Sequence, residues 1–337
     1  MLFKFPSICQ FSGFVANAKK YYTDEKFTFS SSIKLHGTSG AIGYNQEIGL
    51  WFQSHKRIIT PESDNYKFAA TMTEKKEHIQ ELMFTIAQTY SIDLKMNTLM
   101  VYGEWCGSNI QKNVGLNGLP IMFVIFDIAY VLNDEIKGDE TEMKWLNMQK
   151  FDIPASLNKL VYNILDFPTY TLEMDFNKLP EIRNMLIKLT EEVERQCPVA
   201  FMLGKSGIGE GIVWRCQLDN GKVFRFKVKG DEHATSKVTT MAAVDVEKLK
   251  TLDEFVSKSV TENRLQQGIS EIFGNEEKTN AWFQRIGKFI SWVISDVKKE
   301  DMESFPFDVS DPKVSKDLNK AITEKCKHWF KHHVELV

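Results

Sequence analysis

The sequence predicts an α+β domain, built of antiparallel sheets with flanking helices, followed by a small all-helical domain. Two patterns carry this prediction. Short apolar segments typical of strands recur as far as residue 238, mixed with a few helical patterns, and beyond it only amphipathic helical patterns occur. We therefore expect one domain at residues 1–238 and a second at residues 239–337, both ordinary domain sizes.

Seven strands are expected in the first domain, bounded by Gly, Asn and Asp residues. They fall at residues 28–34, 39–44, 50–53, 98–104, 121–130, 211–217 and 222–229. The last two flank Asp219-Asn220-Gly221, and Asn-Gly readily adopts the positive φ angles of a tight turn. This pair is therefore predicted to form a β-hairpin.

Helices are expected in the first domain at residues 65–90, 140–151 and 180–196. The third has Pro180 at an early helical position and Pro198 just beyond its end, a common arrangement at helix boundaries. The second domain is expected to contain helices at residues 245–263, 264–273, 277–299 and 312–337.

Composition and charge favour a soluble, intracellular protein. The 337 residues are 43% hydrophobic with a net charge of −3, which argues against a strongly basic coat for nucleic acid but allows a local basic cleft. The five cysteines are scattered, which indicates neither a disulfide framework nor a zinc site. The N-terminus lacks a signal-peptide pattern, and the most apolar run, 119–132, is too short to span a bilayer and contains Asp127.

The most informative motif is Lys34-Leu35-His36-Gly37-Thr38, at the end of a predicted strand. A lysine that acts as a covalent nucleophile must project from a rigid element, and a nearby glycine lets a nucleotide approach the backbone closely. Because K-x-x-G often occurs by chance, a surface lysine before a turn is the simpler interpretation of the motif alone. The segments that follow it in order give it weight.

Five further segments are expected to join this lysine in one site on antiparallel sheet. In chain order they are Ser54–Arg57, Gly103–Gly107, Phe126–Ile128, Gly209–Trp214 and Phe226–Gly230. In the last segment Lys227 and Lys229 are two residues apart on a strand, so both point to the same face and can reach phosphate oxygens. A solvated strand face would explain these two lysines alone, but the ordered set favours an active site.

Together these motifs resemble the RNA ligase 2 family of ATP-dependent RNA ligases, in the covalent nucleotidyltransferase superfamily of polynucleotide ligases and mRNA capping enzymes. The resemblance spans residues 30–237. Two features resemble this family in particular: the stretch Gly107–Val114 and His36. DNA ligases and capping enzymes usually carry aspartate at the position of His36. The resemblance implies an ATP-grasp-like nucleotidyltransferase domain, with a C-terminal domain that helps to engage the RNA 5′-phosphate end.

The resemblance also implies a three-step reaction that uses ATP and Mg²⁺ or Mn²⁺. A lysine attacks the α-phosphorus of ATP and releases pyrophosphate, AMP passes to an RNA 5′-phosphate, and a 3′-hydroxyl displaces AMP. Lys34 would be the nucleophile. Deprotonating a free lysine at neutral pH costs about 4–5 kcal/mol, and a nearby divalent cation and positive side chains would lower that cost.

The family's nucleotide-binding residues correspond to specific positions of this sequence. Glu104 and Glu210 would hold the ribose and, through water, the metal ion. Lys227 and Lys229 would contact the phosphates. Ile33, directly before the nucleophile, would complete the nucleotide site.

Four further positions have both a functional and a structural interpretation. Phe126 would stack on the adenine, although an aromatic residue inside an apolar strand is more often plain core. Arg57 would contact the ribose or the RNA 5′-phosphate, or is a surface charge. His36 would act after adenylation, or is a hydrogen-bonded structural residue. Ser39 stands where the family more often has asparagine, so a contact with the RNA end there depends on one hydroxyl.

The sequence therefore predicts a monomeric ATP-dependent RNA ligase that joins 3′-OH and 5′-phosphate ends, at nicks in duplex RNA, without membrane association. The alternatives are a DNA or RNA/DNA-hybrid nick ligase, and a nucleotide- or RNA-binding module without catalysis. His328 and His332 lie four residues apart on a predicted helix. With Lys331 between them and no third ligand, a solvated helix face is favoured there over a metal site.

Overall fold

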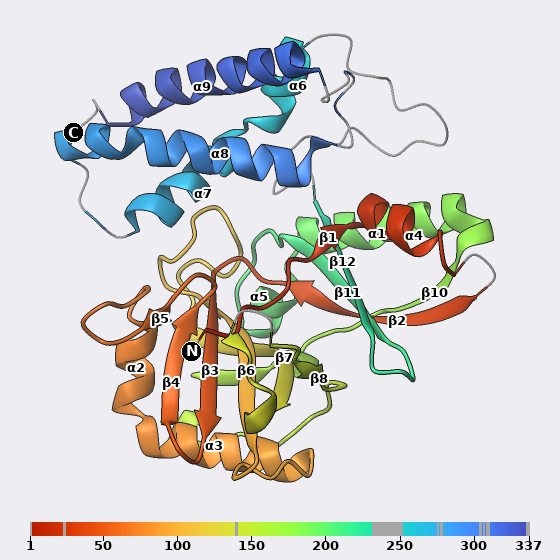
Figure 1. The fold of residues 1–337 in the computed structure, drawn as a ribbon, viewed down its shortest axis with the longest axis vertical. Coiled ribbons are helices and arrows are strands. Elements are labelled where there is room, and N and C mark those ends of the chain that lie inside the picture. The colour runs from red at the N-terminus through yellow and green to blue at the C-terminus, as the bar shows by residue number, and fades with distance from the viewer. Residues whose placement is uncertain are drawn as a thin grey trace. The chain divides into compact units, whose positions relative to one another are not determined.

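The computed structural model describes residues 2–22, 25–138, 141–230, 252–274, 276, 279–302, 305, 307 and 311–334. The chain divides into two compact units, Met1–Val228 and Lys229–Val337. The first contains two β-sheets with flanking helices, and the described part of the second is helical (Figure 1). The predicted α+β class is therefore confirmed. The predicted boundary after residue 238 lies outside the described residues and stays a prediction.

The first sheet, sheet A, has five strands in the order β1–β12–β11–β2–β10. Its members are β1 (Cys9–Gln10), β2 (Lys26–Lys34), β10 (Thr171–Asp175), β11 (Gly211–Gln217) and β12 (Val223–Lys229). β2 pairs antiparallel with β10 and β11, whereas the short β1 pairs parallel with β12. The predicted hairpin joins β11 to β12: Leu218 N donates to Lys222 O at 2.8 Å, and Gly221 has a φ of 83°.

The second sheet, sheet B, has the order β5–β4–β3–β6–β7–β8, and β9 pairs with β7. Its members are β3 (Thr38–Asn45), β4 (Gly49–Ser54), β5 (Ile58–Ile59), β6 (Asn97–Cys106), β7 (Met122–Leu132), β8 (Lys144–Trp145) and β9 (Val161–Asn163). All these pairs are antiparallel except that of β9 with β7. All seven predicted strands are thus present, within two residues at each end.

Alternation along β2 decides which face of sheet A is buried. Phe27, Phe29 and Ile33 are buried among apolar side chains, so Lys34 lies on the opposite face. Three helices contribute to the same core: α1 (Phe11–Ala18), α4 (Leu179–Arg195) and α5 (Pro198–Met202). The face of sheet A that carries Lys34 is therefore the one left for function.

Sheet B is covered differently on its two faces. Apolar side chains of α2 (Phe68–Glu74) and α3 (Lys76–Thr89) pack with Ile42, Val101 and Ile125 on one face. On the other face, Phe3 and Phe5 from the N-terminal segment pack against Tyr102. Short 3₁₀ helices occur in the connections, at Asn133–Glu135 (η1), Ala155–Leu157 (η3), Ile164–Asp166 (η4) and Phe176–Lys178 (η5).

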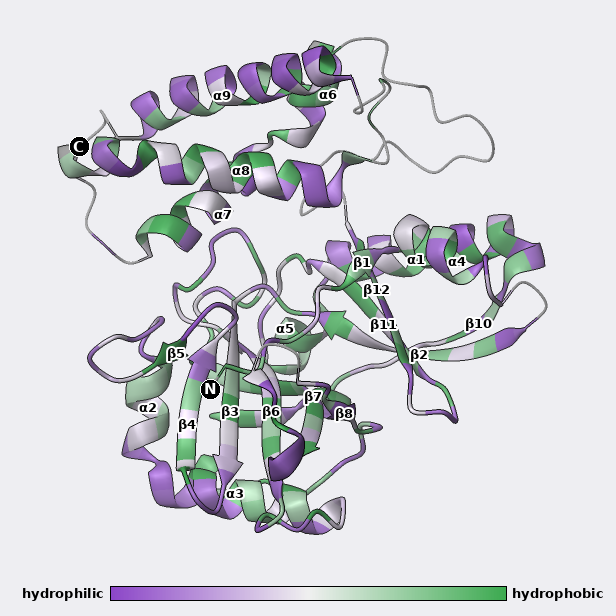
Figure 2. Cartoon of the chain, in the orientation of Figure 1, coloured by the Kyte–Doolittle hydropathy of each residue, from purple (hydrophilic) through white to green (hydrophobic). Residues whose placement is uncertain are grey.

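The second unit is built from α6 (Leu252–Ser259), α7 (Glu262–Phe273), α8 (Ile286–Glu300) and α9 (Pro312–Val334), with a 3₁₀ helix, η6, at Asn280–Arg285. Phe255, Phe289 and Phe330 lie in its apolar core and are fully buried. Helix α9 is coloured mostly hydrophilic in Figure 2, which fits a helix that buries only one stripe. Among the described helices, none has the length and apolarity that crossing a bilayer requires.

Three helix predictions need correction. The helix expected at 140–151 is wrong: in the described part, 141–151, Lys144–Trp145 instead pairs with β7 as β8. The helix expected at 65–90 is broken at Lys75 into α2 and α3. The helix expected at 277–299 begins as 3₁₀ helix over Asn280–Arg285.

The remaining helix predictions are close. Those at 180–196 and 264–273 correspond to α4 and α7. Of the helix expected at 245–263, residues 245–251 lie outside the described residues, and α6 ends at Ser259. Of the last, residues 335–337 lie outside. Helices α1 and α5 and strand β10 were not predicted.

Candidate functional site

The site is centred on Lys34, the last residue of β2. Lys34 pairs with Gly211 of β11, so the preceding residue, Glu210, comes beside it. Lys34 Nζ lies 2.7 Å from Glu210 Oε2, and His36 Nδ1 lies 3.4 Å from the same oxygen. The Glu210 side chain is only 3% exposed, whereas those of Lys34 and His36 are each 23% exposed. The partly exposed amine of Lys34 therefore pairs with the buried carboxylate of Glu210.

Gly37, the glycine of the motif, is held by two side chains. Its N–H donates to Glu104 Oε1 at 2.9 Å, and its carbonyl accepts from Gln111 Nε2 at 3.0 Å. A Cβ at this position would lie 2.4 Å from the carbonyl oxygen of Trp105, closer than atoms approach. The glycine is therefore required because the loop after Lys34 runs directly against β6.

Ser39 and Glu104 are cross-strand partners in the pairing of β3 with β6. Directly opposite residues share a face of the sheet, so the Ser39 hydroxyl and the Glu104 carboxylate lie on the same side. The structure thus places Glu104, Ser39 and the Lys34 loop together. Ile33, in contrast, is 2% exposed, and its side chain lies in the core, on the face of sheet A opposite to Lys34.

Lys227 and Lys229 lie on β12, two strands from Lys34 in sheet A. Phe226, directly before Lys227, is buried in the core. Because side chains alternate along a strand, Lys227 and Lys229 point to the opposite face, the one that carries Lys34. Continued along the hairpin, the register at Leu218–Lys222 sets Lys227 opposite Val213. With strands about 4.8 Å apart, the Cα atoms of Lys227 and Lys34 are then about 12 Å apart.

Arg57 follows β4 in an exposed turn. Its Nη1 donates to the Ser63 carbonyl and hydroxyl, both at 2.7 Å, and its Nη2 donates to the Asp64 carbonyl at 2.8 Å. The next residue, Asn65, donates from Nδ2 to Thr38 Oγ1 at 2.8 Å. The hydrogen bonds of Arg57 therefore hold the loop that contacts Thr38, the residue after Gly37.

Phe126 is the extra residue of a β-bulge. The pairing of β7 with β6 passes from Asp127–Tyr102 to Ile125–Gly103 and skips Phe126. Bulges re-aim a side chain, and here the half-buried ring packs edge-on against Phe5 with centroids 5.1 Å apart. Phe126 is therefore neither a plain core residue nor fully exposed.

A buried charge cluster that the sequence prediction missed links the two sheets. Arg225 of β12 donates from Nε and Nη2 to Asp127 Oδ2 at 2.9 and 2.7 Å, and Arg215 Nε lies 3.5 Å from the same oxygen. Burial lowers the pKa of Arg225, and the Asp127 carboxylate opposes that effect. An aspartate inside an apolar strand signals a buried partner, but the sequence does not tell which arginine it is.

Within the described residues, no group of three or more His, Cys, Asp or Glu side chains is placed to hold a metal ion by itself. Glu210 and Glu104 are the carboxylates nearest the lysine motif. The arrangement therefore offers an amine and a row of cations on one face of sheet A, with the carboxylates of Glu210 and Glu104 beside the lysine motif. Such a set suits a polyphosphate substrate that brings its own metal ligands.

The part of the chain that contains these residues matches a known family. The RNA ligase family model matches residues 28–229, more than half of the chain. Among curated proteins, no sequence matches. The solved RNA ligase of Naegleria gruberi with PPi is similar, with 15% identity over 69% of this chain and 57% of that chain and a TM-score of 0.41.

Two single-residue variants of that ligase are similar to the same degree. One, with ATP and Mn, has 15% identity and a TM-score of 0.43, and another, with AMP and Mn, has 17% identity and a TM-score of 0.40. Each comparison covers 69% of this chain and 57% of the ligase. The chain thus spans less than two thirds of the length of these solved ligases.

Proposed function

This chain belongs to the RNA ligase family, and we propose that it is an ATP-dependent ligase of the RNA ligase 2 subfamily that joins 3′-OH and 5′-phosphate RNA ends at nicks in duplex RNA. The observation that carries the proposal is the 2.7 Å contact between Lys34 Nζ and Glu210 Oε2 at the end of β2. It puts the Lys34 amine on the face of sheet A that carries the lysines of β12, next to the Gly37 loop.

Lys34 would act as the nucleophile in the first step. Its ion pair with Glu210 favours the ammonium form, so the amine must lose its proton once the triphosphate is in place. The nitrogen then attacks the α-phosphorus: an N–P bond forms, and the bond from that phosphorus to pyrophosphate breaks. Lys227 and Lys229 would neutralise the departing phosphates from the same sheet face.

In the second step an RNA 5′-phosphate oxygen attacks the AMP phosphorus, the N–P bond breaks, and Lys34 regains a proton. In the third step the 3′-hydroxyl attacks the RNA 5′-phosphorus, and AMP leaves. His36, 3.4 Å from Glu210, and Ser39, opposite Glu104, would hold the RNA end. Arg57 would assist from the neighbouring loop, and Phe126 would contact the adenine.

A divalent cation fits the donor set. Mg²⁺ is usually held by one or two carboxylates, substrate phosphates and several waters. This site has the carboxylates of Glu210 and Glu104, and among the described residues no cluster of three or more His, Cys, Asp or Glu side chains could hold the ion by itself. Glu210 and Glu104 would hold Mg²⁺ or Mn²⁺ through water. When bound, the cation would neutralise charge on the triphosphate.

Self-adenylation tests this proposal. With labelled ATP and Mg²⁺ or Mn²⁺, we expect AMP to remain on the wild-type protein and Lys34→Ala to abolish the label. Lys26→Ala is the matched control, because Lys26 lies on the same strand, is 71% exposed and pairs with Asp175 at 3.7 Å. A wild-type chain that takes no label would favour the non-catalytic binding module instead.

Sealing assays separate the ligase alternatives. Proteins recognise duplex RNA by its A-form shape, phosphates and 2′-hydroxyls, so we expect a nicked all-RNA duplex to be sealed faster than a hybrid or an all-DNA duplex. Equal sealing of the DNA nick would favour the DNA or hybrid ligase. We further propose that the protein works as a monomer in a reducing, intracellular compartment.

A further inference from the structure

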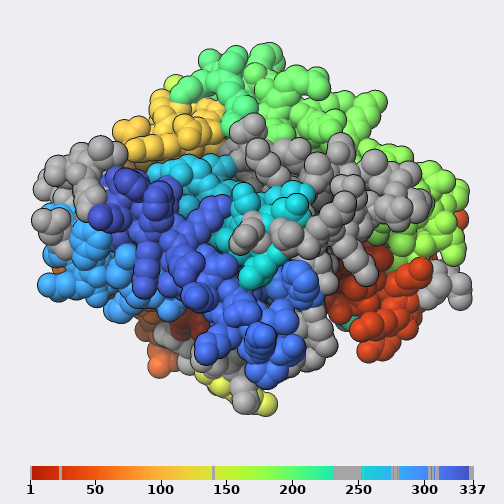
Figure 3. All heavy atoms as spheres, turned by 90° about the horizontal axis from the view of Figure 1, so that it is seen from above, coloured from red at the N-terminus to blue at the C-terminus, as the bar shows by residue number. Residues whose placement is uncertain are grey.

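The first unit contains a pocket of about 310 Å³ that the proposed ligase chemistry does not use. It lies where α1, β1 and the start of β12 meet (Figure 1). The N-terminal segment, which contributes to its rim, is red in Figure 3 and reaches the surface in that view. The volume is large enough for one or two side chains of a partner.

The walls of this pocket are aromatic. Phe14, which is 4% exposed, packs edge-on against Phe224 with ring centroids 5.6 Å apart, and Tyr22 packs edge-on against the same ring at 5.4 Å. Tyr21, which also lines the pocket, is 79% exposed. The pocket therefore suits an apolar side chain, which these rings would surround.

Strand β12, beside the pocket, is only partly covered on the side that faces β1. β1 pairs with it at two residues, Phe226 and Lys227. On the other side, the hairpin bond from Leu218 N to Lys222 O fixes which backbone groups of β12 point to β11. Alternation along an antiparallel pair then assigns residues 222, 224 and 226 to β11, and residues 223, 225 and 227 to the side of β1.

Three backbone groups of β12 are therefore left at an open edge. Parallel pairing of Cys9 opposite Phe226 uses the Arg225 carbonyl and the Lys227 N–H. The N–H and carbonyl of Val223 and the N–H of Arg225 remain on this side, and within the described ranges no hydrogen bond reaches them. A row of alternating donors and acceptors of this kind is what an added strand satisfies.

The N-terminal segment does not cover this edge, because its start is fixed on sheet B. Phe3 N donates to Gln53 Oε1 at 3.2 Å, and the Phe3 carbonyl accepts from Gln53 Nε2 at 2.6 Å. Pro6 has no N–H to offer, and the chain reaches β12 only at Cys9. The position beside Val223 is thus open to an extended segment from another chain.

Lys222 gives the pocket its charge. Its Nζ lies 3.4 Å from Tyr22 Oη, and 5.3 and 5.2 Å from the ring centroids of Tyr22 and Phe224. None of the residues that line the pocket is acidic, and the other cation among them, Arg225, is bonded to Asp127. Lys222 and Phe224 share one face of β12, so a strand with an apolar residue at Phe224 would bring a carboxylate two positions away to Lys222.

We propose that this pocket and the open edge of β12 bind an extended segment of a partner protein as an added strand of sheet A. The segment would hydrogen-bond to Val223 and Arg225. It would place an apolar side chain in the aromatic pocket and, two residues away, an acidic side chain at Lys222. The site is separate from the proposed ligase reaction, since Val223 lies four residues, about 13 Å along β12, from Lys227.

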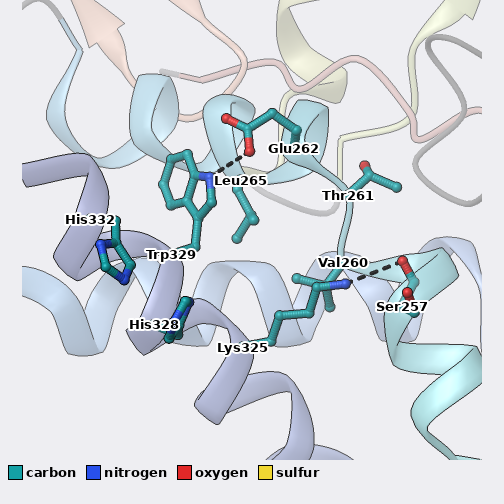
Figure 4. Close-up of a pocket in the computed structure, with 9 residues that line it drawn as sticks. All are labelled: Ser257, Val260, Thr261, Glu262, Leu265, Lys325, His328, Trp329 and His332. Atoms are coloured by element: carbon teal, nitrogen blue, oxygen red, sulfur yellow. Dashed lines mark hydrogen bonds between the residues drawn. The ribbon is translucent and has the colours of Figure 1, made fainter.

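The larger pocket of the second unit, about 500 Å³, provides an internal comparison. Its lining comes from α9, α7 and the end of α6, and His328, Trp329 and His332 line it from α9 (Figure 4). A pocket between helices presents side chains but no strand edge, because helical N–H and C=O groups bond within each helix. A partner that binds by strand addition should therefore ignore it.

Peptide selection on the full chain tests the site. The probe is a displayed library of random octapeptides, and we expect the enriched peptides to carry an apolar residue two positions from Asp or Glu, without proline between them. When the best of them is bound, amide hydrogen exchange should slow at residues 223–225. A selection without binders, or binders that slow exchange only elsewhere, would overturn the proposal.

Two substitutions probe the edge and the charge separately. The N–H of Val223 points away from β11, so Val223→Pro keeps the hairpin ladder but removes a donor, and it should weaken peptide binding about tenfold. Lys222→Glu should weaken it about fivefold, and a peptide with lysine in place of its acidic residue should recover the loss. His332→Ala, at an exposed residue of the comparison pocket, is the control and should leave affinity unchanged.

Self-adenylation and circular dichroism keep the two proposals separable. Both variants should match the wild type in AMP labelling and in their spectra, which shows that they are folded. A wild-type chain that binds the peptide at residues 223–225 but takes no label supports the docking site and refutes the ligase. Undiminished peptide binding by Val223→Pro would overturn the docking site alone. A wild-type dimer that Val223→Pro dissociates would identify a second copy as the occupant and also overturn it.

Discussion

The two units are each held by a buried cluster of three charges, and the clusters have opposite composition. In the first unit one carboxylate, Asp127, pairs with Arg225 at 2.7 Å and with Arg215 at 3.5 Å. In the second unit one guanidinium, Arg264, pairs with Asp296 at 2.8 Å and Asp301 at 2.5 Å. The first cluster has a net positive charge and the second a net negative charge.

The two clusters also differ in where they lie. Arg215 and Arg225 extend from the face of sheet A that also carries Lys34 and Lys227, so their excess positive charge favours a polyphosphate. Arg225 is held further by Trp145, 4.3 Å from the guanidinium carbon to the ring centroid. Arg264 is fully buried and joins α7 to the end of α8, a structural task.

The clusters also differ in how they respond when a substitution removes the central charged residue. A buried carboxylate without its partner can take up a proton, whereas an arginine stays charged at any physiological pH. Removing Asp127 leaves two positive charges that cannot be discharged, while removing Arg264 leaves carboxylates that can be. We therefore expect the first cluster to be the more sensitive of the two.

The largest effect is expected from Asp127→Asn. The substitution keeps the shape but leaves two arginines without a counter-charge, and it should lower the free energy of unfolding of the first unit by about 3–5 kcal/mol. Self-adenylation should fall as well, because Arg225 precedes Lys227 on β12. Urea unfolding and AMP labelling measure the two effects.

Glu135→Gln is the control for this variant. Glu135 pairs with Lys144 at 3.1 Å, and both side chains are nearly half exposed, so the change in stability should stay within about 0.5 kcal/mol. An Asp127→Asn protein as stable as this control would show that the buried carboxylate does not hold the sheets together.

A smaller effect is expected from Arg264→Met. Methionine fills much of the space, and the buried Asp301 can be protonated, so the loss of stability in the second unit should be about 3 kcal/mol, the low end for a broken buried pair. Lys288→Ala, at an exposed position of α8, should change little. Self-adenylation of both variants should equal the wild type, and a loss in Arg264→Met would contradict the structural role of its cluster.

The smallest effect is a pH dependence at Cys326, beside the Arg264 cluster. Burial raises the pKa of this thiol from 9.0 to about 12, and Lys325 and Arg264 oppose the rise. Above about pH 9 the unfolded chain releases this proton and the folded chain keeps it, so stability falls as the pH rises.

Between about pH 8 and pH 10, Cys326 should therefore contribute a loss of about 1.4 kcal/mol per pH unit above its unfolded pKa. The difference between the wild-type and Cys326→Ala unfolding curves across this range isolates the contribution. Parallel curves would show that the thiol titrates normally in the folded protein.

Local patterns were sufficient for most strands of the first unit. β11 runs from Gly211 to Gln217 as predicted, and the turn after it has the positive φ at Gly221 alone, where glycine adopts it without strain. The helix predicted at 140–151 failed for a tertiary reason. The Trp145 carbonyl accepts from Gln217 Nε2 and Leu146 N donates to the Ile128 carbonyl, so contacts with distant strands replace helical hydrogen bonds there.

For the site, the order of the motifs along the chain was more informative than the number of residues between them. Lys34, Glu104 and Glu210 are 70 and 106 residues apart in turn, and pairing of β2 with β11 and of β3 with β6 brings Glu210 to Lys34 and Glu104 to Gly37. The role of Phe126 as a bulge residue could not be predicted, because a bulge is defined by the partner strand.

The sequence by itself determined the fold class, the hairpin, and the identity and order of the residues around Lys34, because alternation, turn residues and residue chemistry are local properties. Only the tertiary structure decided that Lys34 Nζ meets Glu210, that Gly37 lies against β6, and that Asp127 joins Arg215 to Arg225. These contacts join residues far apart in the chain, and their partners are selected by strand register and by the high cost of burying a charge alone.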